Sequence, residues 1–274
     1  MSMFGEPSDE PAAKPAGDQV VCLRVIVTVK AAPNPSDKYG ETVCVAGVSA
    51  DPARPGWFRL YPINFRELGD DASFRKYDVI SVDAVPARQD ARAESWRPRM
   101  NTLRIDNHVA DRHRREWIDP YVGLTTMCGL NRGATMRSPS LGLIQPQKVT
   151  DLVITRHPGW TTAQQAKIDK YVGQLDLFGT EDRTALQAPR FIGTYHYVCA
   201  EPDCRGHRQG IIDWEFVALQ RKLRDRDDQT ATRLLRQKFL DQMCAPNRNV
   251  AFYVGNLAAH PTTFSVLGVY WPAR

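Results

Sequence analysis

The first half of this 274-residue chain contains short β-forming runs that no helical pattern separates. Four runs rich in Val and aromatic residues are divided by clusters of Pro, Gly, Asn and Asp, and they lie at 20–30, 41–48, 57–61 and 77–85. Strands so close in sequence pair readily as antiparallel neighbours, whereas parallel strands need long crossovers, usually helical. The pattern therefore favours an antiparallel β-barrel-like domain over a parallel α/β domain.

The later part of the chain has a mixed pattern. Thr161 and Gln164 match a capping box, which predicts a helix over 162–172. A strand is expected over 191–198, followed by an amphipathic helix that opens at Asp213. Further elements are expected as a helix over 230–243 and strands over 250–254 and 264–271. This half is predicted to be α+β.

Composition changes along the chain suggest the domain limits. Residues 1–18 are rich in Pro, Gly, Ala and acids, so they cannot offset the entropy of ordering and are expected to be disordered. Strands over 141–144 and 149–155 are assigned to the first half. The resulting prediction is an α+β protein with a disordered tail at 1–18, a β-rich barrel-like domain at 19–158, a helix and linker at 159–190, and an α+β domain at 191–274.

Two thiols and an imidazole lie within nine residues at Cys199, Cys204 and His207. Thiolate and imidazole are the ligands of structural Zn²⁺, and Cys244 is the natural fourth ligand from a distant segment, with His196 and His260 as the next candidates. The spacing is not that of the commonest zinc fingers. Cys199 as an ordinary buried thiol, or a cysteine nucleophile paired with His207, are the alternatives.

The chain carries a net charge of +5 and a pI near 8.9, and arginine predominates among its basic residues. Arginine binds phosphate through paired hydrogen bonds, so the balance favours a nucleic-acid partner, either DNA or RNA. A GC-rich codon bias would give the same ratio without any ligand. A binding surface would instead show as a cluster of basic residues.

The candidate nucleic-acid contacts lie in turns, loops and one short basic helix. Residues 111–117 form the densest positive cluster, and the loop over 90–99 combines charge with a tryptophan. An equally simple interpretation is that these side chains form solvated surfaces, with the aromatics of the strands in the core. The predicted contacts are Arg54, Arg59, Trp96, Arg97, Arg112, Arg114, Arg115 and Arg132.

Two other function classes stay open. Asp213 and Glu215 lie beside the Cys/His cluster, so a metal-dependent nuclease or phosphoesterase using them with His207 and His260 is the main alternative. An aspartate that opens a helix, with a glutamate in the first turn, is also what N-capping and the helix dipole favour without any substrate. A protein-interaction scaffold is the second alternative. The pattern leaves enzymatic activity and oligomeric state undetermined.

Cysteine usage and hydropathy indicate the compartment. The chain has six cysteines, no pattern of a signal peptide, and no apolar run near the ~20 residues that a membrane span requires. We therefore expect a cytoplasmic protein with reduced thiols and no membrane partner.

Overall fold

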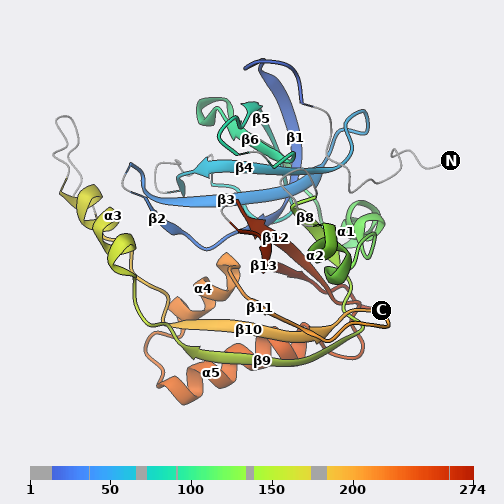
Figure 1. Cartoon of the computed structure of the whole chain (residues 1–274), viewed down its shortest axis with the longest axis vertical. Coiled ribbons are helices and arrows are strands. Elements are labelled where there is room, and N and C mark those ends of the chain that lie inside the picture. Colours follow the sequence, from blue (N-terminus) through green and yellow to red (C-terminus); the bar gives the residue numbers. More distant parts are fainter. Residues whose placement is uncertain are drawn as a thin grey trace.

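The computed structural model describes residues 14–36, 38–65, 73–90, 92–133, 139–173, 184–258 and 260–274. Most of the tail predicted to be disordered lies outside these ranges. Figure 1 shows a barrel formed by the first part of the chain, with the C-terminal elements packed below it. The predicted α+β class with an N-terminal barrel is confirmed.

Five strands close the barrel in the order β1-β3-β4-β6-β5, and β5 pairs back onto β1. All of these pairs are antiparallel except β4 with β6. Two short strands extend the sheet, β2 on β3 and β7 on β5. The bounds are β1 Val21–Lys30, β2 Asn34–Ser36, β3 Gly40–Ser49, β4 Trp57–Ile63, β5 Asp78–Pro86, β6 Ser95–Pro98 and β7 Arg104–His108.

Strand β1 is apolar on both faces because each face meets a different core. Leu23, Val25 and Val27 point into the barrel interior, as the strand period of two requires. Ile26 and Val29 on the other face pack against the C-terminal part of the chain. The near-continuous run of β-branched residues therefore reflects a strand buried on both sides.

Two antiparallel three-stranded sheets form the C-terminal half, in the orders β9-β10-β11 and β8-β12-β13. The strands assigned from sequence to the first half, β8 and β9, pair instead with β12 and β10. Adjacency along the chain misled that assignment, since their partners lie much later in the sequence. The bounds are β8 Leu141–Ile144, β9 Lys148–Arg156, β10 Phe191–Val198, β11 His207–Gly210, β12 Ala251–Leu257 and β13 His260–Tyr270.

The helices occupy the margins of the sheets. The capping box at Thr161 and Gln164 forms as predicted, and its helix packs against β2 and β3. The helix expected over 230–243 is α-helical to Arg236 and then continues as a π-helical turn over Gln237–Gln242. The α-helices are α1 Asp111–Ile118, α2 Met127–Gly133, α3 Thr162–Val172, α4 Trp214–Lys222 and α5 Asp228–Arg236, with 3-10 turns at Met100–Thr102 and Asp119–Tyr121.

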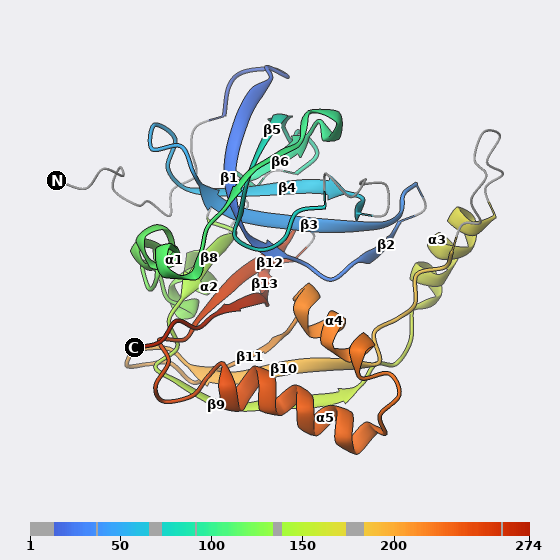
Figure 2. The ribbon, with the colours of Figure 1, turned by 180° about the vertical axis from the view of Figure 1, so that it is seen from behind.

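The sheet β9-β10-β11 buries only one face. Phe191, Tyr195 and Tyr197 of β10 are buried, whereas Ile192 between them is 42% exposed. Phe216 of α4 belongs to the same core, together with residues of α5. Figure 2 shows α5 running alongside β9 and β10, and α4 lies next to β10.

A shared core joins the barrel to the C-terminal half. The edge of the Trp57 ring packs against Tyr253, with ring centroids 6.2 Å apart. The Arg59 guanidinium crosses the same boundary and donates hydrogen bonds to both the carbonyl and the hydroxyl of Ser140, at 3.1 and 3.2 Å. Within the described ranges, no helix has the length and apolarity that a membrane crossing demands.

Candidate metal centre and basic cleft

Four metal-ligating side chains meet at one end of β10 and β11. They are Cys128, Cys199, Cys204 and His207, whose ligand atoms all lie within 4.8 Å of one another. The Sγ atoms of Cys128 and Cys199 are 3.4 Å apart, and the Nε2 atom of His207 lies 3.3 Å from Sγ of Cys204. Such a donor set can bind a metal ion.

Local structure explains why these donors converge. Cys199 directly follows β10, and His207 opens β11, so the turn between the paired strands returns the chain to the same point. Gly206 in that turn has φ of +91°, a conformation that favours glycine. The backbone N–H of Cys199 donates to Sγ of Cys204 at 3.4 Å, which holds the turn closed over the sulfur atoms.

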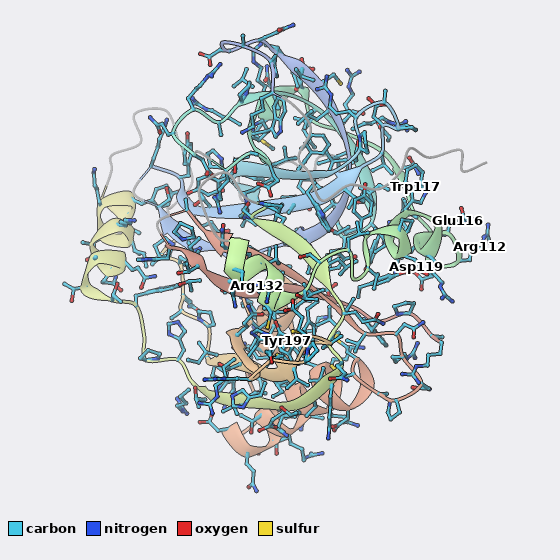
Figure 3. The ribbon with its side chains drawn as sticks, turned by 45° about the vertical axis from the view of Figure 1, so that its right-hand side comes forward. Arg112, Glu116, Trp117, Asp119, Arg132 and Tyr197 are labelled. Carbon is cyan, nitrogen blue, oxygen red and sulfur yellow. The ribbon has the colours of Figure 1, made fainter. Side chains whose placement is uncertain are left out.

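Helix α2 brings the donor that the sequence analysis missed. Cys128 lies 71 residues before Cys199. Thr126 accepts a hydrogen bond from Gly129 N at 2.9 Å and donates to Glu201 in the turn between β10 and β11. Arg132 also pairs with Glu201, which lowers the pKa of that carboxyl. Figure 3 shows Arg132 on α2 near Tyr197 of β10, whose ring lies against His207 at 5.2 Å between centroids.

Cys244 does not join this cluster, which corrects the expected fourth position. Its thiol donates to the carbonyl of Phe239 at 3.5 Å, at the end of the π-helical turn. Burial raises the pKa of Cys244 to about 12. The sequence favoured Cys244 as a ligand from a distant segment, and no spacing signal linked Cys128 to Cys199, Cys204 and His207.

In the absence of metal, the surroundings of each donor shift its pKa. Burial raises the pKa of Cys128 to about 12. At Cys204 burial acts in the same direction, but hydrogen bonds from the backbone of Cys199 and Gly206 outweigh it and lower the pKa. Burial lowers the pKa of His207, which favours the neutral imidazole that coordinates metals.

The proposed hydrolytic residues do not share a site. Asp213 caps α4 by accepting a hydrogen bond from Glu215 N at 3.0 Å, as its position before the helix predicted. His207 belongs to the cysteine cluster, and His260 is exposed at the start of β13. Across the described part of the chain, these four side chains do not gather into a metal-binding group.

Asp213 instead forms a buried charge cluster with a lysine of the barrel. Lys76 Nζ lies 3.6 Å from Asp213 Oδ2 and 3.1 Å from Glu215 Oε2. Burial opposes the ammonium charge, but the two carboxylates overcome it and raise the pKa of Lys76. Asp213 is completely buried beside a second carboxylate, and this desolvation raises its pKa to about 6 despite Lys76.

The predicted nucleic-acid contacts fall into two groups. Trp96 is 1% exposed inside the barrel against Phe58, and Arg59 is 3% exposed in its bonds to Ser140, so neither presents a surface to a ligand. These two residues are withdrawn as contacts, because Trp96 points from β6 into the barrel core and Arg59 points from β4 toward Ser140 of the C-terminal half. Arg97 is exposed on β6, Arg54 lies at a barrel turn, and Arg132 is engaged with Glu201.

The arginines of α1 line a cleft with basic residues from the other end of the chain. The cleft has a volume of about 1090 Å³ and lies between α1, α4, the π-helical turn and the C-terminus. Figure 2 shows the chain end beside α1. Its basic lining residues are Lys76, Arg112, Arg114, Arg115, Lys222, Lys238, Arg248 and Arg274, and its acidic ones are Asp111 and Glu215.

Comparison with known proteins yields two family models. The model described as Domain of unknown function (DUF8758) matches residues 22–120, the barrel and α1. No curated protein matches the chain. A crystal structure of the tetrameric p202 HIN2 covers 97% of each chain at 9% identity with a TM-score of 0.31, an overlap that supports no inference here. The second model, Domain of unknown function (DUF8757), matches residues 123–274, more than half of the chain, and the protein belongs to this family.

Proposed function

We propose that this protein binds nucleic acid through the basic cleft and that a structural zinc ion holds its C-terminal half together. The observation that carries the proposal is that basic residues from both halves of the chain line one cleft. A diffuse codon bias does not require such convergence, whereas a phosphate-binding surface does. Phosphate contacts supply most of the non-specific affinity for nucleic acid.

The basic residues of the cleft differ in how they are held. The Arg114 guanidinium stacks over the Tyr77 ring at 3.9 Å and donates to the carbonyl of Val109, so it is fixed in the cleft wall. Arg115 pairs with Asp119 at 3.0 Å. Arg112 and Lys222 are exposed, and no carboxylate of the described residues lies within 4.0 Å of either. These two are the residues best placed to take a phosphate.

Zinc suits the Cys/His cluster by donor chemistry and size. Bonds of about 2.3 Å to sulfur and about 2.0–2.1 Å to nitrogen put tetrahedral donors about 3.5–3.8 Å apart. The closest donor pairs in the cluster are 3.3–3.5 Å apart, so a small inward or outward movement would accommodate the ion. Three cysteines and one histidine leave no open position for substrate, which is the pattern of structural zinc. The ion would tie α2 to the β10–β11 turn.

The binding proposal is tested by gel shift and fluorescence anisotropy on DNA and RNA, first at low salt. Affinity should fall steeply as salt rises, because phosphate contacts release counterions. Substituting Arg112 with Ala should weaken binding to all sequences alike and make the salt dependence shallower. Arg114 is left intact because its removal would disturb the cleft wall.

The matched control is Lys167→Ala, which removes an exposed charge from α3, an element that does not line the cleft. It should leave affinity within about twofold of the wild type. The absence of any complex with single or double strands at low salt would reject the proposal. Equal losses from Arg112→Ala and from Lys167→Ala would leave only a diffuse charge effect.

A further inference from the structure

The basic cleft has an apolar wall as well as a charged one. Leu219 and Leu223 of the α4 region line it with partly exposed side chains. Trp271 lies beside them, with Lys238 Nζ 4.5 Å and the Arg248 guanidinium 4.9 Å from its ring centroid. Cations and an aromatic ring are therefore interleaved within one concave surface.

This combination distinguishes two forms of nucleic acid. A duplex presents phosphates outward and keeps its base faces stacked inside, so it can use the cationic residues of the cleft but not the apolar wall. A single strand exposes both, and proteins that bind single strands combine a basic groove with aromatic side chains on which bases stack. The cleft lining matches the second set of requirements.

The volume of the cleft also favours a single strand over a duplex. A volume of about 1090 Å³ lies just above the range of small-ligand sites, which is roughly 300–1,000 Å³. It can therefore enclose a short stretch of single strand but not the body of a double helix. Arg112 on one side and Lys222 on the other stand at exposed positions of the lining, where a backbone entering the cleft would meet them.

We infer that the cleft is a single-strand site, in which Trp271 and the apolar wall contact bases while Arg112 and Lys222 contact the phosphate backbone. This inference rests on the proposed function and specifies its substrate class. Lys238 and Arg248 lie over the Trp271 ring, so a base that stacks there would take the place of one of these cations, which would then pair with the adjoining phosphate.

The test compares one labelled 15-nucleotide single strand with the duplex made from it, at the same salt. The wild type should bind the single strand at least about tenfold more tightly. Trp271→Ala should lower single-strand affinity about tenfold, since stacking on an aromatic contributes about 1–3 kcal/mol per base. Trp271→Phe keeps a ring and should retain most of the affinity, which separates stacking from a packing defect.

Lys222→Glu and Lys167→Glu form the matched charge pair, because both lysines are exposed on helices and only Lys222 lines the cleft. Lys222→Glu should weaken single-strand binding about tenfold, while Lys167→Glu should change it less than twofold. Duplex binding as tight as single-strand binding, with both sensitive to Lys222→Glu, would overturn the single-strand inference and leave the proposed function standing. Single-strand binding that none of the cleft variants alters would also overturn it. No binding of either form would reject both proposals.

Discussion

The two halves of this protein manage the edges of their sheets in opposite ways. In the barrel, pairing of β5 with β1 closes the ring, so all five strands have neighbours on both sides. The C-terminal half has two open three-stranded sheets, and β11 forms a short outer strand at the edge of one of them. Closed backbone pairing and a filled interior hold the first structure together, whereas the second has open strand edges and would gain from a further constraint.

The Cys/His cluster is located where that constraint is needed. It joins the turn before β11 to α2, a seven-residue helix that is too short to be stable by itself. The barrel instead buries large side chains such as Trp96 and Phe58 in its interior. We therefore expect a metal ion to contribute little to the stability of the barrel and much to the stability of the C-terminal half.

The largest expected effect comes from Cys128→Ser. Loss of one ligand should reduce zinc from near one ion per chain to near none, and structural zinc contributes many kcal/mol to the domains that depend on it. Hydrogen exchange should then show loss of protection in β10 and β11 while β1 and β5 keep theirs. Elemental analysis and exchange measured on the same sample check both points.

Cys244→Ser is the matched control for that experiment. Its thiol donates to Phe239 O and lies outside the cluster, so the variant should retain full zinc. Zinc lost from Cys244→Ser and retained in Cys128→Ser would contradict the assignment of ligands. Wild-type protein that is free of metal and fully protected in β10 would show that the C-terminal half needs no such constraint.

A smaller effect is expected at the charge cluster that joins the two halves. In the folded protein the pKa of Asp213 is about 6, whereas the pKa of an aspartate in an unfolded chain is about 3.9. As pH falls from about 6 to about 4, the folded state takes up a proton that the unfolded state does not, so wild-type stability should rise relative to Asp213→Asn. Across this pH range, the free energy of unfolding of the wild type should rise by about 3 kcal/mol relative to that of Asp213→Asn. Urea unfolding of both proteins measures this change. Asparagine can still cap α4.

Asp227→Asn provides the control of opposite sign. Asp227 caps α5 by accepting a hydrogen bond from Thr230 N at 2.8 Å, and hydrogen bonds from Thr230 lower its pKa. A lowered pKa contributes stability that is lost on acidification, so wild type should lose stability relative to this variant below about pH 4. Parallel pH curves for wild type and Asp213→Asn would refute the buried, proton-binding role of Asp213.

Local patterns predicted most of the elements, because their signals lie within a few residues of one another. The strands at 21–30 and 191–198 and the helix capped by Thr161 are found where period and capping placed them. The segment over 90–99 was expected to be a loop, yet Ser95–Pro98 forms β6 by pairing with β4 and β5. Four residues carry too little periodicity to indicate a strand whose stability comes from its neighbours.

The candidate sites were predictable only as far as their residues are local. Cys199, Cys204 and His207 form one turn, so their spacing indicated the cluster. Cys128 comes from α2, and no local feature connects it to that turn. Lys222 likewise joins Arg112 only through the fold, so the sequence indicated basic segments but not the cleft. Long-range packing, which single-sequence patterns do not encode, decides both.

The smallest expected effect concerns α3, which lies between β9 and β10 in sequence but packs on β2 and β3 of the barrel. Thr161 Oγ1 accepts from Gln164 N at 3.3 Å, and Gln164 Oε1 accepts from Thr161 N at 3.0 Å. Thr161→Ala removes half of this capping box and should cost about 1 kcal/mol, seen as roughly fivefold faster amide exchange in the first turn of α3. Thr161→Ser should restore the wild-type rates because serine caps equally well.

The barrel strands should be unaffected by Thr161→Ala, since the ring of backbone pairs does not include α3. Faster exchange in β3 as well would mean that α3 and the barrel unfold as one unit, and it would remove the distinction drawn here between a self-sufficient barrel and the segments that depend on added contacts.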